Sequence, residues 1–143
     1  MSKPDPALLD PARYPHQVEI APRYADLDPN NHLNNVALAA IIEDARVRFH
    51  HASGFAKSLG PKGQVMIAQL NISYFAQCYY PAPITVCTGV AKAGNTSMRL
   101  LHLLVQDGKP AVLADAVVVH VEDGKAAPLP EALNAQLERW TCR

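Results

Sequence analysis

The pattern of apolar and polar residues predicts one long helix in the first third of the chain. Residues 36–42 are all apolar, and from residue 43 to 49 charged residues are interspersed with apolar ones. A helix from about Asn34 to His51 would therefore be buried in its first half and partly exposed in its second. Asn34 or Asn35 is suited to be its N-cap, and Gly54 can adopt the left-handed conformation that commonly ends a helix.

Alternation of apolar and polar residues predicts five strands around this helix. They span residues 16–23, 64–78, 84–92, 96–106 and 111–122. Proline residues at 81 and 83 separate the second strand from the third, and turn residues at 93–95 and 107–110 suit two hairpins. Because the apolar helix lies between the first two strands, we expect an α+β fold in which a five-stranded antiparallel sheet wraps around a central helix.

Several side chains are expected to have structural roles. Cys78 and Cys87 lie in apolar segments and are predicted to be small core residues, and the pair His50-His51 would place positive charge at the helix end. Residues 130–140 are expected to form a short surface helix. In the second strand, simple alternation places five residues on one face, namely Met66, Ala68, Leu70, Ile72 and Tyr74.

Length and composition limit the class of protein. A chain of 143 residues suits a single domain spanning residues 1–143, and a formal net charge of zero gives no electrostatic basis for binding nucleic acid. The three cysteines have no paired spacing, and we find neither an apolar leader nor a membrane-length apolar run. The sequence therefore predicts a cytoplasmic protein with no membrane or nucleic-acid partner.

The loop before the predicted helix is the best candidate for chemistry. Residues 24–35 contain two carboxylates, one imidazole and four carboxamides. A helix N-terminus offers unpaired N–H groups and partial positive charge, which stabilise a developing oxyanion. Asp28, ionised at neutral pH, could attack a carbonyl group directly or deprotonate a water molecule. Neither route requires a metal, and no metal-ligand spacing is present.

Each of these residues also has a structural interpretation. Asp26 or Asp28 could form an Asx-turn, and Asn34 could do no more than cap the helix. Glu43 is a second-tier candidate, because a solvated helix face or an ion pair with Arg46 explains it as well.

The same residues resemble a known family. Residues 26–35, Asp-Leu-Asp-Pro-Asn-Asn-His-Leu-Asn-Asn, are similar to the D-x-D-x-x-x-H-V-N-N signature of hotdog-fold thioesterases, and residues 43–46 resemble their E-x-A-R helix. The relatives indicated are the 4-hydroxybenzoyl-CoA thioesterase and acyl-CoA thioesterase family, and acyl-carrier-protein thioesterases share the loop. The resemblance covers roughly residues 16 to 130 and implies a hotdog fold.

The resemblance also implies roles for individual residues. Asp28 falls on the family's nucleophile or general base, and Asn30 and His32 fall on the polar pair that the carrier-protein branch uses beside it. The oxyanion donor falls on the backbone N–H of Asn35. The resemblance gives no position for the residues that would bind the coenzyme A phosphates.

An acyl-CoA thioesterase acting without a cofactor is thus the function that the sequence favours, and the resemblance implies a homodimer or homotetramer with sites at the subunit interface. Two family positions differ here, because Asn31 replaces a usual glycine and Leu38 a usual aromatic residue. These differences leave open a non-catalytic acyl-thioester binding protein. An acyl-carrier-protein thioesterase and a hotdog dehydratase are further alternatives, although the loop favours hydrolysis over hydration.

Overall fold

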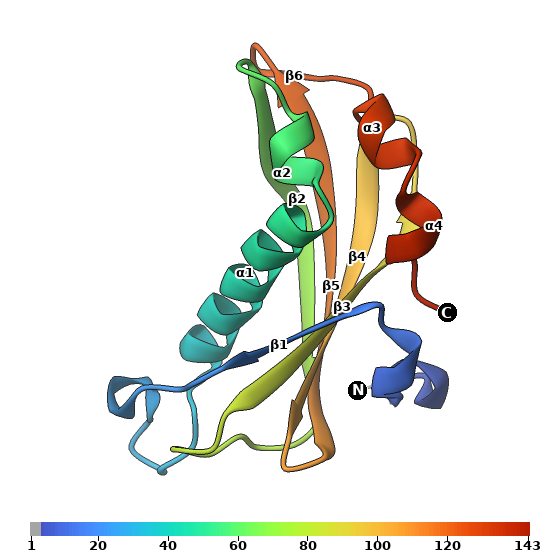
Figure 1. Cartoon of the computed structure of the whole chain (residues 1–143). Coiled ribbons are helices and arrows are strands. Elements are labelled where there is room, and N and C mark those ends of the chain that lie inside the picture. The colour runs from blue at the N-terminus through green and yellow to red at the C-terminus, as the bar shows by residue number, and fades with distance from the viewer. Residues whose placement is uncertain (1–3) are drawn as a thin grey trace.

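A curled antiparallel sheet and one long helix dominate the structure, a computed structural model that describes residues 4–143 (Figure 1). The helix, α1, spans Asn35–Ala52 and lies along one face of the sheet. The sheet has the strand order β1-β3-β4-β5-β2, and a short strand, β6, pairs with β5. This arrangement confirms the predicted α+β hotdog fold.

The strand boundaries differ slightly from those that alternation predicts. The strands are β1 (His16–Ile20), β2 (Gly63–Tyr74), β3 (Ile84–Ala93), β4 (Ser97–Gln106), β5 (Lys109–Glu122) and β6 (Lys125–Ala126). The β4–β5 hairpin turns at Asp107 and Gly108, whose φ angles of 51° and 76° are the left-handed values that a tight hairpin requires. The second strand was predicted to reach Cys78 but ends at Tyr74, and residues 75–83 form an irregular connection.

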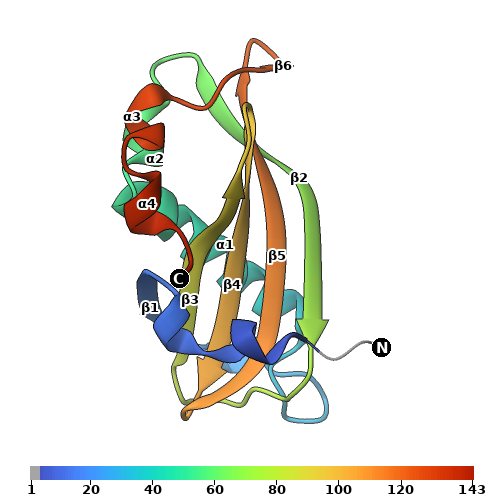
Figure 2. The same cartoon turned by 90° about the vertical axis from the view of Figure 1, so that its right-hand side faces the viewer.

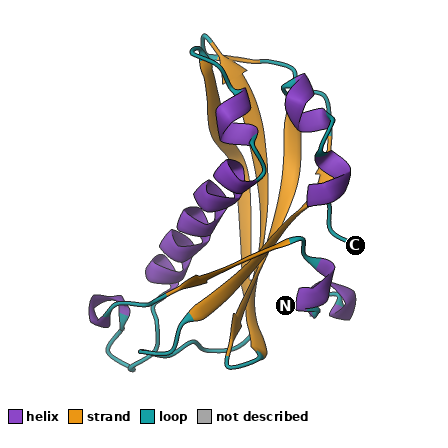
Figure 3. Cartoon of the chain, in the orientation of Figure 1, coloured by secondary structure: helices purple, strands orange, loops and turns teal. Residues whose placement is uncertain are grey.

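Short helices make up the remaining regular structure (Figure 3). They are the 3-10 helices Pro6–Leu9, Pro11–Arg13 and Tyr24–Asp26, and the α-helices α2 (Phe55–Ser58), α3 (Glu131–Asn134) and α4 (Leu137–Trp140). The prediction of one surface helix near the C-terminus was wrong in two respects. The segment forms two separate turns, and its Leu133 and Trp140 are buried against Phe49 and neighbouring core residues.

Capping and burial explain the limits of α1. The side chain of Asn34 accepts a hydrogen bond from the N–H of Ala37 over 2.6 Å, so Asn34 rather than Asn35 is the N-cap. Ile42, Ala45 and Phe49 along the helix are fully buried. Beyond the helix, Gly54 has a φ of 81°, the left-handed conformation expected at this position.

Strand β2 contains a β-bulge that alternation cannot reveal. Ile67 pairs with Val118 and Gln69 with Val117, which leaves Ala68 as an extra residue. Val65 on one side of the bulge and Ile72 on the other both pack against the core. The predicted single face from Met66 to Tyr74 was therefore wrong, and the Met66 side chain is largely exposed.

The opposite face of the sheet is covered by the N-terminal segment. In Figure 2, α1 lies behind the sheet and residues 4–15 cross in front of it. Leu8, Leu9 and Tyr14 of this segment pack against an apolar cluster on the sheet formed by Cys87, Leu101, Leu103 and Val105. No helix among residues 4–143 is long and apolar enough to cross a membrane.

Polar side chains are buried between α1 and the sheet. His50 was expected to carry positive charge at the helix end, but burial and the nearby Arg46 lower its pKa to about 4, so it is neutral at pH 7. His102 on β4 is fully buried as well, and its Nδ1 lies 3.0 Å from the Thr88 hydroxyl oxygen. His50 and His102 are therefore two neutral, buried histidines beside the buried guanidinium group of Arg46.

Candidate active site

The loop from residue 26 to 34 is held in a fixed shape by the Asp28 side chain. Its Oδ1 atom accepts hydrogen bonds from the backbone N–H groups of Asn30, at 2.8 Å, and His32, at 3.1 Å. The Asp28 N–H donates to the His32 carbonyl over 2.8 Å, which closes the loop. The Asx-turn interpretation is therefore confirmed for Asp28, and it leaves the second carboxylate oxygen available for other contacts.

The other aspartate of the motif has a different environment. Asp26 is buried, and its carboxylate accepts hydrogen bonds from the backbone N–H and guanidinium group of Arg23. The side-chain hydrogen bond from Arg23 lowers the pKa of Asp26. Its carbonyl oxygen accepts the N–H of Asn34 over 2.9 Å. Asp26 thus anchors the loop to the helix cap, whereas Asp28 faces a pocket.

The first turn of α1 presents a backbone donor beside that pocket. The Asn34 side chain accepts the N–H of Ala37, and residues 4–143 supply no acceptor for the N–H of Asn35. An unpaired N–H at a helix N-terminus, reinforced by the helix dipole, suits an oxygen atom that gains negative charge. The carbonyl oxygen of Asn35 is occupied separately, because it accepts a hydrogen bond of 3.3 Å from the Tyr74 hydroxyl.

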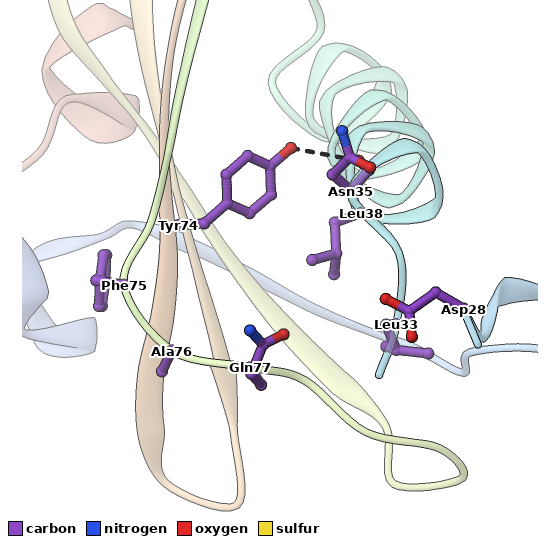
Figure 4. A pocket seen from close by; sticks show the side chains of 8 residues that line it. All are labelled: Asp28, Leu33, Asn35, Leu38, Tyr74, Phe75, Ala76 and Gln77. Carbon is purple, nitrogen blue, oxygen red and sulfur yellow. Dashed lines mark hydrogen bonds between the residues drawn. The ribbon is translucent and has the colours of Figure 1, made fainter. Parts of the chain in front are cut away.

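Asp28 and Asn35 line one pocket of about 620 Å³ (Figure 4). The helix head and the Asp28 loop form one side of it, and the end of β2 with the following segment forms the other. Leu33, Leu38 and the ring of Tyr74, the last residue of β2, contribute apolar surface to it. The full lining is Asp28, Leu33, Asn35, Leu38, Tyr74, Phe75, Ala76 and Gln77. The pocket therefore combines one carboxylate, one helix N-terminus and a wall of mixed polar and apolar groups.

The structure separates the four sequence-predicted site residues into two pairs. Asp28 and Asn35 line the pocket, whereas Asn30 and His32 are not among its lining residues. Asn30 is exposed and acts on Asp28 through its backbone N–H. His32 does the same, and its ring packs edge-on against Tyr79 with ring centroids 5.3 Å apart.

Sequence reasoning missed one wall of the pocket. Tyr74, Phe75 and Gln77 come from a segment about forty residues beyond the motif, and no local pattern connects the two. Leu38, where the family's usual aromatic residue is replaced, does line the pocket. The second-tier candidate Glu43 lies elsewhere, because it is exposed and its carboxylate is 4.0 Å from the Arg46 guanidinium group.

The cysteines occupy structural positions. Cys78 and Cys87 are buried, as predicted for core residues, and burial raises the pKa of each thiol to about 11. A thiol with such a pKa is protonated at neutral pH and is a poor nucleophile. Asp28 is therefore the stronger candidate for nucleophile or base.

The chain thus has a hotdog fold in which a carboxylate and a helix N-terminus line the same pocket, and comparison with protein families identifies its class. The sequence model of the Thioesterase-like superfamily matches residues 22–137, and the chain belongs to this family. The match includes the Asp28 loop, all of α1 and the four long strands that follow. A comparison with curated protein sequences finds no match.

Solved structures support the same fold. The PA5185 protein of Pseudomonas aeruginosa strain PAO1 superimposes with a TM-score of 0.82 at 24% identity, covering 92% of this chain and 94% of its own. A predicted thioesterase from Bacillus stearothermophilus has a TM-score of 0.78 at 25% identity, with coverages of 89% and 96%. A thioesterase from Thermus thermophilus, complexed with coenzyme A and Zn, has a TM-score of 0.76 at 26% identity, with coverages of 88% and 93%.

Proposed function

We propose that this protein is an acyl-CoA thioesterase that hydrolyses an acyl thioester to the free acid and the thiol. The observation that carries the proposal is the shared pocket of Asp28 and the Asn35 helix head. Membership of the Thioesterase-like superfamily supports thioester hydrolysis, and a similar thioesterase has been solved with coenzyme A. The acyl-CoA substrate and the roles of the residues are part of the proposal.

The proposed chemistry uses the free oxygen of Asp28. In one route this oxygen attacks the thioester carbon, the C–S bond breaks, and water then hydrolyses the resulting anhydride to the acid. In the other route Asp28 takes a proton from a water molecule that attacks the same carbon, and the departing thiolate is protonated. Both routes develop negative charge on the thioester oxygen, and the Asn35 N–H would donate to it.

The backbone of Asn30 and His32 supports either route. Their N–H groups both bind Oδ1 of Asp28, so that oxygen is held in place and the other is directed elsewhere. A fixed carboxylate loses little freedom on reaching the transition state. In this proposal Asn30 and His32 are positioning residues, and neither side chain takes part in proton transfer.

We further propose that the active assembly is a homodimer, alone or as the unit of a tetramer, in which two copies pair through β2. Strand β2 is twelve residues long and lies at the sheet edge with no neighbour on its outer side among residues 4–143. Exposed Met66, Ile67 and Leu70 make this edge apolar. A long apolar edge strand is a template for pairing with another chain, and an isologous pair closes after two copies.

The position of this edge connects assembly to the site. Tyr74 is the last residue of β2 and lines the pocket, and Phe75, Ala76 and Gln77 continue the same wall. A second copy on β2 would therefore border the pocket. Val36, on the first turn of α1, is 73% exposed and adds apolar surface beside it.

A thiol-release assay over short, long and aromatic acyl-CoA substrates tests the proposed function. We expect turnover with at least one class. Binding of acyl-CoA without turnover would instead indicate a non-catalytic binding protein. Release from acyl-carrier protein but not from acyl-CoA would indicate the carrier-protein alternative, and hydration of an enoyl thioester would indicate a dehydratase.

A further inference from the structure

Gln106, the last residue of β4, makes three hydrogen bonds to a segment far away in the sequence. Its Oε1 atom accepts the N–H of Tyr79 over 2.8 Å. Its Nε2 atom donates to the carbonyl oxygens of Tyr79, at 2.7 Å, and Ala82, at 2.9 Å. The side chain is buried, with the residue 6% exposed. One amide group thus satisfies three backbone groups of an irregular segment that has no strand partner there.

This segment, residues 75–82, is hereafter called the pocket strap because its first three residues line the pocket opposite α1 (Figure 4). The Gln77 side chain lies on the pocket side of the strap, whereas the Phe75 ring lies on its far side. The strap also contacts the loop that carries Asp28. The Leu33 N–H donates to the Cys78 carbonyl over 2.8 Å, and the Tyr79 ring packs edge-on against His32.

We propose that Gln106 is a positioning residue for the active site, which holds the pocket strap and through it the Asp28 loop. The contacts from Gln106 to Asp28 form an unbroken series. Gln106 fixes the backbone of Tyr79, the adjoining Cys78 carbonyl binds Leu33, and the Tyr79 ring contacts His32, whose N–H binds the Asp28 carboxylate. This inference rests on the proposed thioesterase function for its catalytic consequence, but the mechanical link can be measured without it.

The chemistry of the contact favours glutamine over glutamate and methionine. A buried glutamate beside two carbonyl oxygens is favoured in its protonated form, which can accept from Tyr79 but donates only one O–H to the two carbonyl oxygens. Methionine has a similar length and offers neither group. A graded loss from glutamine to glutamate to methionine is therefore expected if the hydrogen bonds themselves matter, because buried backbone groups left unpaired are costly.

Position in the sheet makes the effect local. Gln106 pairs with Lys109 at the end of the β4–β5 ladder, so its side chain is not needed for the strands to form. Thr88→Val offers a matched control, because Thr88 is also buried and hydrogen-bonded in the same sheet but its partner is His102. That substitution removes a buried hydrogen bond without touching the pocket strap.

The experiment compares Gln106→Met, Gln106→Glu and Thr88→Val with the wild-type chain on one acyl-CoA, well below their melting temperatures. We expect kcat to fall roughly tenfold to a hundredfold in Gln106→Met, less in Gln106→Glu and little in Thr88→Val, because small displacements of reacting groups are expensive. KM should change much less than kcat. If Gln106→Met does not fold, Gln106→Glu carries the same comparison.

Amide hydrogen exchange tests the link independently of activity. We expect exchange at both Tyr79 and Leu33 to accelerate in the Gln106 variants and to stay at the wild-type rate in Thr88→Val. Unchanged exchange at Leu33 in a folded Gln106 variant would overturn the inference, and so would wild-type kcat. Absence of any hydrolysis by the wild-type chain would count against the proposed function, and the exchange result would still decide whether Gln106 holds the loop.

Discussion

Leu33 donates its backbone N–H to the carbonyl oxygen of Cys78, and this bond of 2.8 Å joins the two halves of the candidate site. Leu33 belongs to the loop that carries Asp28, and Cys78 belongs to the pocket strap. The pocket is therefore assembled from segments that are distant in sequence and become neighbours only when the sheet closes around α1. Substitutions in either segment should therefore alter the position of Asp28.

Asp28→Asn should keep the fold and lose most hydrolysis. An asparagine oxygen can still accept the N–H groups of Asn30 and His32, but an amide is neither an effective base nor a nucleophile. We expect kcat to fall by about a hundredfold or more, measured by thiol release. Asp44→Asn, an exposed aspartate paired with Arg48, is the control. Wild-type turnover by a folded Asp28→Asn variant would exclude Asp28 from the mechanism.

His32→Ala should reduce activity less than Asp28→Asn does. The contact of His32 with Asp28 is made by the backbone N–H, which alanine retains, whereas the ring packs against Tyr79. The pH–rate profile of the wild-type protein should therefore show no rise at about pH 6–7, where histidine side chains ordinarily titrate. A loss as large as that of Asp28→Asn would assign the ring a direct catalytic role.

Ile67→Glu should disrupt the proposed assembly. In an isologous β2 pair the substitution would place two carboxylates in one interface, and like charges there oppose association. Sedimentation should show dimers or tetramers for the wild type and monomers for the variant, with activity lost in the monomers. Gln136→Glu adds the same charge at an exposed C-terminal position and should change neither property. A fully active monomer would contradict the proposal.

His50→Leu should make stability less sensitive to acid. Burial and the nearby Arg46 lower the pKa of His50 from 6.5 to about 4. Between about pH 6.5 and 4 the unfolded chain therefore binds a proton at His50 that the folded chain does not, so the free energy of unfolding decreases as the pH falls through this range. One such group contributes up to about 1.4 kcal/mol per pH unit.

The measurement is urea unfolding of the wild type, His50→Leu and His51→Leu across that pH range. Only His50→Leu should reduce the slope of stability against pH, because His51 is exposed at the neighbouring position of α1. His102, buried beside Arg46 and His50, should sustain part of the slope in every variant. Equal slopes in the wild type and His50→Leu would mean that His50 is not neutral in the folded protein.

Local chemistry explains what the sequence could predict. The apolar run of α1, its asparagine cap and the Asp107–Gly108 turn each depend on neighbouring residues, so α1 and the β4–β5 hairpin are close to their predicted places. The same holds for Asp28 and Asn35, which one short loop brings to one pocket. Their catalytic roles stay predictions.

Contacts over long distances in the chain explain what the sequence could not predict. The wall formed by Tyr74 to Gln77 meets Asp28 only through the closure of the sheet, and nothing near Gln106 indicates that its amide binds Tyr79. The burial of His50 likewise depends on packing against Phe55, whose ring centroid lies 5.1 Å away. Tertiary packing, rather than helix position, decides its charge.

The bulge at Ala68 changes which positions of β2 face the core. Residues before it bury odd-numbered positions such as Val65, and residues after it bury even-numbered ones such as Ile72 and Tyr74. Because Val118 and Val117 are consecutive on β5, deletion of this one small residue would make Ile67 and Gln69 regular ladder neighbours, and both halves of β2 would keep their faces. An alanine with no partner in the ladder thus offsets the residue numbering of β2 by one relative to its faces, in a strand that reaches the core at one end and the pocket at the other.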